Sequence, residues 1–222
     1  PTMKGLWVKD LLLLQKQLKT FLIFMLIAAF NAYTIKSVPV IFIMMAFFFV
    51  TTTSSTIFYD QENHGFLYLF TLPIRKKDYV IQKQLLVLVS ALVATLLSVG
   101  LILLLMPFVP ELQTSAQDLL YNALYSFFYG CFYGAIITPL YLRYGTEKAR
   151  VFIFAIMGIL AMVIILLQKT GVLDNLESSE FIDSVAAFNP LQITSLILAL
   201  SIAMLGVSTI VSRRFIEKSV AF

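Results

Sequence analysis

The sequence predicts an all-α integral membrane protein in which residues 1–222 form a single domain with six transmembrane helices. Hydrophobic residues make up 60% of the chain and charged residues only 13%, and the mean hydropathy is +0.92. A soluble domain of this size needs a more polar surface. The apolar residues also come in blocks of about 20, the length that an α-helix needs to cross the hydrocarbon core of a bilayer. Short segments of alternating polarity, which are typical of membrane β-barrels, do not occur in the sequence.

The first residues predict a helix that lies on the membrane rather than across it. Pro1 and Thr2 precede Met3, and we interpret these two residues as a cloning scar. Residues 4–19 contain an apolar core that is too short to span, with lysines on both flanks. This pattern favours an interfacial amphipathic helix that leads into the first span.

Prolines help to delimit the six predicted spans. A proline stands at the start of the second span and another at the start of the sixth, and Pro107 and Pro110 end the third. The predicted spans are about 20–36, 38–59, 79–106, 118–142, 150–168 and 190–212. Between the last two spans, acidic residues at three-residue spacing within 169–189 predict a short amphipathic helix at the outer surface.

The basic residues predict the orientation of the chain. The N-terminal helix holds four, and the loop before the third span holds four together with the start of that span. The loop after the fourth span and the C-terminal tail hold three each. These segments lie on one side of the predicted membrane and carry 14 of the 16 lysines and arginines. Only Lys36 and Lys169 lie on the other side. The positive-inside rule therefore predicts that both termini are cytoplasmic.

Several kinds of chemistry are missing from the sequence. It has no phosphate-binding loop, no nucleophile elbow and no zinc-protease motif. Cys131 is the only cysteine and His64 the only histidine, and no nucleic-acid-binding motif accompanies the net charge of +4. No charged residue falls in the middle of a predicted span, which argues against a proton- or sodium-driven carrier. We therefore expect no catalytic residue, no metal, no cofactor and no nucleic-acid partner for this chain.

The loop between the second and third spans, about 60–78, is unusually apolar and aromatic for a segment in water. A short helix can form before Leu72-Pro73 ends it, and the basic residues after it can bind lipid headgroups. A short apolar helix held close to the membrane is suited to dock a soluble partner. The residues expected to form this docking site are Glu62, Gly65, Phe66, Leu67, Tyr68, Phe70, Leu72 and Pro73. The alternative is that the aromatic side chains form a belt at the membrane interface.

The same loop carries a resemblance to a known family. Permease subunits of type-2 ABC exporters have a glutamate, a nearby glycine, a run of leucines, Leu-Pro, and a basic stretch that leads to a lysine early in the third span. This sequence has the same order in Glu62, Gly65, Leu67, Leu69, Leu72-Pro73, Arg75–Lys77 and Lys83. The chain therefore resembles such a permease. Its short length and compact loops are most similar to the bacterial half-size permeases that export phenol-soluble modulins, which are amphipathic peptides.

The resemblance implies that the loop is a cytoplasmic coupling helix docked on a separate ATPase subunit, which binds the ATP and magnesium. It implies two permease copies and two ATPase subunits in a bacterial plasma membrane, exporting amphipathic or hydrophobic peptides with a role in virulence. It also implies that the segment 169–189 gates the exit, although a solvated acidic face is the alternative. A drug or lipid exporter, a non-transporting sensor or immunity protein, and a membrane enzyme are the other functions considered.

Two polar features inside the predicted spans are candidates for the lining of a pathway. The second span contains a run of six hydroxyl residues, and the fourth span has a tyrosine at every fourth position. The candidate lining residues are Thr51, Thr52, Ser55, Tyr121, Tyr125 and Tyr129. The alternative for both features is helix packing, and packing is the favoured interpretation of Gly130 and Gly134 in the fourth span.

Small residues at helical spacing predict two further packing faces. One is on the third span and the other on the sixth. They consist of Ser90, Ala94 and Ser98, and of Ser195, Ala199 and Ala203.

Overall fold

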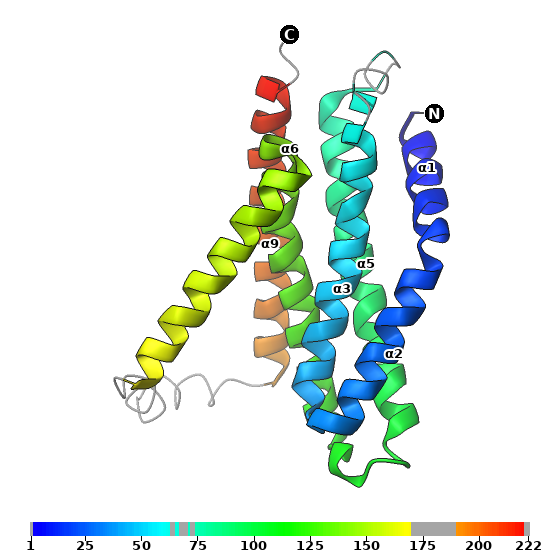
Figure 1. The fold of residues 1–222 in the computed structure, drawn as a ribbon, viewed down its shortest axis with the longest axis vertical. Helices are drawn as coiled ribbons and strands as arrows, with labels where there is room; N and C mark the ends of the chain where they lie inside the picture. The colour runs from blue at the N-terminus through cyan, green and yellow to red at the C-terminus, as the bar shows by residue number, and fades with distance from the viewer. Residues whose placement is uncertain (1, 63–64, 67–70, 72–73, 170–189, 220–222) are drawn as a thin grey trace.

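The computed structural model of the chain is a bundle of helices aligned along one long axis (Figure 1). It describes residues 2–62, 65–66, 71, 74–169 and 190–219. Every regular element in these ranges is helical, which confirms the predicted all-α class. The predicted outer helix at 169–189 lies, apart from its first residue, outside the described residues, and so does most of the predicted coupling helix.

The main elements of the described chain are six α-helices and one 3-10 helix. They are α1 (Thr2–Lys16), α2 (Leu18–Ile35), α3 (Val38–Gln61), α5 (Lys76–Leu105), η2 (Pro110–Leu112), α6 (Ala116–Lys169) and α9 (Pro190–Ser219). Five segments among the described residues are long and apolar enough to cross a membrane: α2, α3, α5, Ala116–Gly145 of α6 and Thr194–Ile216 of α9. The predicted fifth span, 150–168, is helical as the C-terminal part of α6 but is not among these five. The chain is thus multi-pass, and a count of six spans stays a prediction.

A single glycine replaces the loop that was expected between the fourth and fifth spans. Gly145 has φ +73° and ψ 164°, which is non-helical, and helix continues on both sides of it. Glycine tolerates a positive φ because it has no Cβ. At this break α6 changes direction, and its C-terminal part (yellow) leads away from the other helices (Figure 1).

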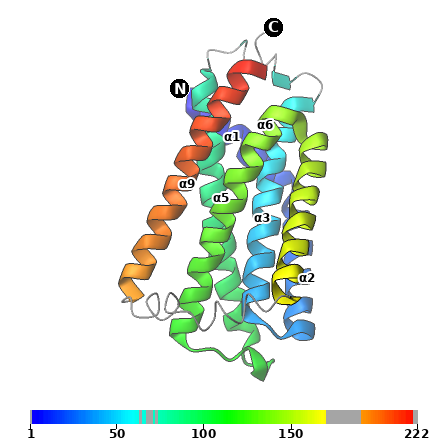
Figure 2. The ribbon, with the colours of Figure 1, turned by 90° about the vertical axis from the view of Figure 1, so that its left-hand side faces the viewer.

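The loops and termini gather at the two ends of the bundle. Both chain ends, the connection between α3 and α5, and the bend of α6 lie at one end, while the α2–α3 turn and the connection from α5 to α6 lie at the other (Figures 1 and 2). We call the end with the two chain termini the basic end, because its segments carry most of the lysines and arginines. At the opposite end Lys36 forms an ion pair with Glu111, and the hydrogen bond from Lys36 holds the pKa of Glu111 below its ordinary value.

Two glycines of α6 let this helix approach α5 closely. A Cβ on Gly134 would lie 2.1 Å from Cγ1 of Val87, and one on Gly130 would lie 2.9 Å from Cβ of Ala91. Carbon atoms in contact are normally about 3.5–4.0 Å apart. The prediction that these glycines serve helix packing is therefore confirmed.

The two predicted faces of small residues have different outcomes. On α5, Ser90, Ala94 and Ser98 are all buried, as expected. On α9 the described bundle does not bury the predicted face, because Ala199 and Ala203 are exposed, and its role in helix contact stays a prediction. The buried side chains among the described residues of α9 are Ser201, Leu205, Ser208, Ser212 and Ile216. The hydroxyl of Ser208 donates to the carbonyl oxygen of Ala135 on α6 at 2.7 Å, so a hydrogen bond as well as small size decides which face packs.

Candidate functional site

Four charged side chains from three helices meet inside the basic end, and we call them the ion cluster: Lys9 and Asp10 of α1, Asp60 of α3 and Lys83 of α5. Nζ of Lys83 lies 2.7 Å from Oδ2 of Asp10 and 2.9 Å from Oδ2 of Asp60. Lys9 donates a hydrogen bond to Asp60, and its Nζ lies 3.3 Å from Oδ1 of Asp10. The exposed fractions of Asp10, Asp60 and Lys83 are 0%, 7% and 2%. Two ammonium groups thus balance two carboxylates in a buried site.

Neutral side chains add further hydrogen bonds to the ion cluster. The third acceptor for Lys83 is the hydroxyl of Thr56 at 3.0 Å, so its ammonium group has one acceptor for each of its three N–H bonds. Tyr79 donates its hydroxyl proton to Oδ2 of Asp60 at 2.8 Å, and Gln82 donates to Oδ2 of Asp10 at 2.8 Å. Buried charges are tolerated in proteins when they are paired and hydrogen-bonded in this way.

The described residues of the predicted docking loop lie next to the ion cluster. Glu62 caps the C-terminal end of α3, two residues after Asp60. A Cβ on Gly65 would lie only 2.6 Å from the carbonyl oxygen of Asp60, so the loop backbone passes close to the end of α3. The ring of Phe66 meets the ring of Tyr79 edge-on, with 5.7 Å between the centroids. Leu67, Tyr68, Phe70, Leu72 and Pro73 lie outside the described residues.

We compared the sequence of the chain with models of known protein families. A family model described as "ABC-2 family transporter protein" matches residues 5–217. The chain belongs to the ABC-2 transporter family. It is therefore a multi-pass membrane component of an ABC-2 transporter, and membership implies pairing with an ATPase subunit. No curated protein and no solved structure matches the chain in the corresponding searches.

Sequence reasoning did not anticipate the buried charges of this ABC-2 protein. The sequence predicts Lys83 only as part of the family motif, and it predicts no role for Asp10. The available signal was Asp60 near the end of the apolar second span, because a charged residue at such a position calls for a partner. The N-terminal helix also ends at Lys16 rather than at residue 19, and it buries Leu6 and Asp10 in the bundle. Its predicted position at the membrane interface stays a prediction.

The hydroxyl run of α3 is mostly bonded within the helix. Thr51 donates to the carbonyl oxygen of Phe47 at 2.7 Å, Thr52 to that of Phe48 at 2.8 Å, and Ser55 to that of Thr52 at 2.6 Å. Such bonds satisfy hydroxyl groups in an apolar environment without any cargo. Only the oxygen of Ser54, among the hydroxyls of the run, is buried with no hydrogen-bond partner in the described chain.

The tyrosines of α6 lie in different environments. Tyr133 is buried, its hydroxyl is 3.1 Å from that of Thr51, and its ring stacks on Tyr129 with 6.2 Å between the centroids. Tyr125 is 56% exposed, and Tyr121 is half-buried. The structure thus joins the hydroxyl run and the tyrosine series at one contact between α3 and α6. A role of these residues in lining a pathway stays a prediction.

Proposed function

We propose that this chain is the permease subunit of an ATP-driven exporter and that a separate ATPase subunit docks on its loop 62–73. Family membership supports the transporter assignment. The observation that carries the docking proposal is the attachment of the loop to the ion cluster through Phe66, Tyr79 and Asp60. A docking loop must pass the movement of the ATPase to the membrane helices, so it needs a stiff connection at its base.

The ion cluster supplies such a connection. Phe66 contacts Tyr79, Tyr79 is hydrogen-bonded to Asp60, and Lys83 links Asp60 to Asp10 on α1. Separating buried opposite charges leaves each of them without a partner in a medium of low polarity, at a cost of about 3–5 kcal/mol. Displacement of the loop by the ATPase therefore moves α1, α3 and α5 together.

The proposed assembly has two permease copies and two ATPase subunits in a bacterial plasma membrane. Each permease has six spans, of which the C-terminal part of α6 is the fifth, and both termini are cytoplasmic. The concentration of lysines and arginines at the basic end supports this orientation. ATP and magnesium bind to the ATPase subunits, and no hydrolysis takes place on the permease.

The proposed cargo is an amphipathic or hydrophobic peptide. The candidate lining residues on α3 and α6 offer hydroxyl groups and tyrosine rings, which combine an apolar surface with a polar tip. None of them carries a charge, which suits an amphipathic molecule better than an ion. The segment 169–189 remains the candidate for the exit gate.

The docking proposal is tested by adding charge to the loop. Replacing Leu67→Asp together with Phe70→Asp should abolish co-purification with the ATPase subunit, because two carboxylates would then face an apolar groove. The matched control is Phe108→Asp with Gln113→Asp, which places the same charges in the exposed loop at the opposite end of the bundle. The control should retain the ATPase. Equal co-purification of both variants from the membrane fraction would contradict docking on this loop.

The cargo proposal needs a separate measurement. ATP hydrolysis by the permease–ATPase complex in lipid vesicles should rise when an amphipathic helical peptide is added. A scrambled peptide of the same composition, which lacks an apolar face, should leave the rate unchanged. Equal rates with both peptides and without peptide would contradict a peptide cargo, while the docking result would stand on its own.

A further inference from the structure

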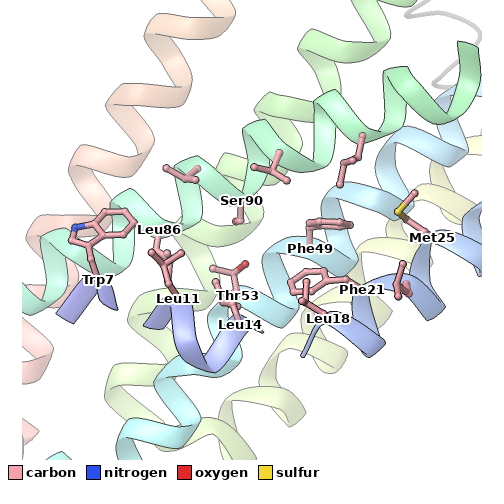
Figure 3. A pocket seen from close by; sticks show the side chains of 14 residues that line it. Trp7, Leu11, Leu14, Leu18, Phe21, Met25, Phe49, Thr53, Leu86 and Ser90 are labelled. Atoms are coloured by element: carbon pink, nitrogen blue, oxygen red, sulfur yellow. The ribbon is translucent and has the colours of Figure 1, made fainter. Parts of the chain in front are cut away.

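A long apolar cavity lies on the outer side of the bundle, between α1–α2 and α5 (Figure 3). Its volume is about 380 Å³. Its lining residues are Trp7, Leu11, Leu14, Leu18, Phe21, Leu22, Met25, Phe49, Thr53, Leu86, Val89, Ser90, Val93 and Leu97. None of these residues is charged, and only Thr53 and Ser90 carry a hydroxyl group. The cavity therefore suits a hydrocarbon and offers almost nothing to water.

The surroundings of the cavity indicate which hydrocarbon is available. Most of its lining comes from α2, α3 and α5, which are long and apolar enough to cross the bilayer. Leu18 and Leu22 on one wall are 55% and 60% exposed, so the cavity is open toward the side on which lipid chains lie. A soluble ligand would have to leave water and cross lipid to reach it, whereas the acyl chain of a phospholipid is already there.

One end of the cavity has the chemistry of a headgroup site. Trp7 lines the cavity at this end (Figure 3), and tryptophan is enriched where a membrane meets water. Lys4 precedes Trp7 by three residues on α1, so the two residues share a face of the helix. Lys4 is exposed and has no ion-pair partner within the described chain, in contrast to Lys9, which is engaged in the ion cluster. A free ammonium group beside an interfacial tryptophan is complementary to the phosphate of an anionic lipid.

We propose that this cavity binds one anionic phospholipid, with an acyl chain between α1–α2 and α5 and the phosphate at Lys4. The bound chain fills the space beside the ion cluster, since Leu86 follows Lys83 by one helical turn and Leu11 follows Asp10 directly. The lipid thereby adds contacts between α1 and α5 beside those that the ion cluster makes. This proposal concerns the permease chain alone and does not depend on its cargo or on its ATPase.

The test uses Trp7, which is the only tryptophan of the chain. The full chain is reconstituted in phosphatidylcholine vesicles that contain a small fraction of phosphatidylglycerol with brominated acyl chains, which quench tryptophan fluorescence on contact. Brominated phosphatidylglycerol should quench Trp7 with an apparent affinity about fivefold higher than brominated phosphatidylcholine, because one lysine attracts an anionic lipid with about that preference. Lys4→Gln should remove the preference and leave the fold unchanged.

A variant that fills the cavity separates a bound lipid from ordinary lipid contact. Val93→Phe puts a ring into the cavity from α5, and it should reduce quenching by both lipids. The control is Leu92→Phe, the preceding residue on the same helix, which is similarly exposed but does not line the cavity. The proposal would be overturned if quenching of Trp7 depended only on the fraction of brominated lipid in the bilayer, and did so equally in all variants. An amphipathic peptide that displaces the brominated lipid from the unmodified chain, but not from Val93→Phe, would assign the cavity to cargo and overturn it as well.

Discussion

Replacing Lys83→Met is expected to destabilise the protein by about 3–5 kcal/mol, because it removes one partner from a buried ionic network. Lys83 bonds to Asp10, Asp60 and Thr56, and without it two buried carboxylates share only the ammonium group of Lys9. The methionine side chain keeps the volume but supplies no charge. The loss should begin at α1, whose Asp10 then keeps only the neutral Gln82 as a partner on α5. Trp7 lies on α1, so its fluorescence during thermal unfolding in detergent measures this loss directly.

Two further variants test whether the loss of stability comes from the unpaired buried charges or from removing any lysine of α5. Lys77→Met, on the same helix but exposed, should leave the midpoint of unfolding nearly unchanged. Adding Asp10→Asn to Lys83→Met restores a neutral cluster, since Lys9 then balances Asp60, and it should recover part of the lost stability. If Lys83→Met unfolded at the same temperature as Lys77→Met, the ion cluster would not hold α1 to the bundle.

The helical fold was predictable because hydropathy and prolines are local properties of the chain. The second span was predicted at 38–59, and α3 extends over Val38–Gln61, with Pro39 in its first turn. The connection after the fourth span was predicted as a loop because polar and basic residues cluster there. Its actual form, a break at Gly145 alone, depends on the backbone angles of one glycine, which composition does not reveal.

The ion cluster was not predictable in the same way because its members are far apart in the sequence. Asp10 and Lys83 are separated by 73 residues, and only the packing of α1 on α5 brings them together. The proposed docking loop, in contrast, is a continuous motif, and its prediction rests on the order of its residues. The structure adds that Gly65 and Phe66 at its base contact the same helices that hold the cluster. Sequence reasoning therefore predicts a docking loop but not the charges behind it.

Replacing Gly134→Ala is expected to destabilise the bundle by about 1–3 kcal/mol, the usual cost of adding volume to a packed contact. The new methyl group would lie 2.1 Å from Cγ1 of Val87, far inside the contact distance of two carbon atoms. Val87 is β-branched and its side chain has one strongly preferred rotamer in a helix, so it has little freedom to move aside. The contact must therefore widen, which moves α6 away from α5. The midpoint of thermal unfolding, followed by circular dichroism, measures the cost.

A second glycine provides a control in which the expected effect has the opposite sign. Nothing lies within 4 Å of the Cβ position of Gly100 on α5, so Gly100→Ala should stabilise its helix by about 0.5–1 kcal/mol through the higher helix propensity of alanine. Combining Gly134→Ala with Val87→Ala removes the clashing methyl groups and should recover most of the loss. If Gly134→Ala were as stable as Gly100→Ala, α5 and α6 would not need glycine at their closest approach. Opposite signs at the two glycines would show that close packing, and not flexibility, requires Gly134.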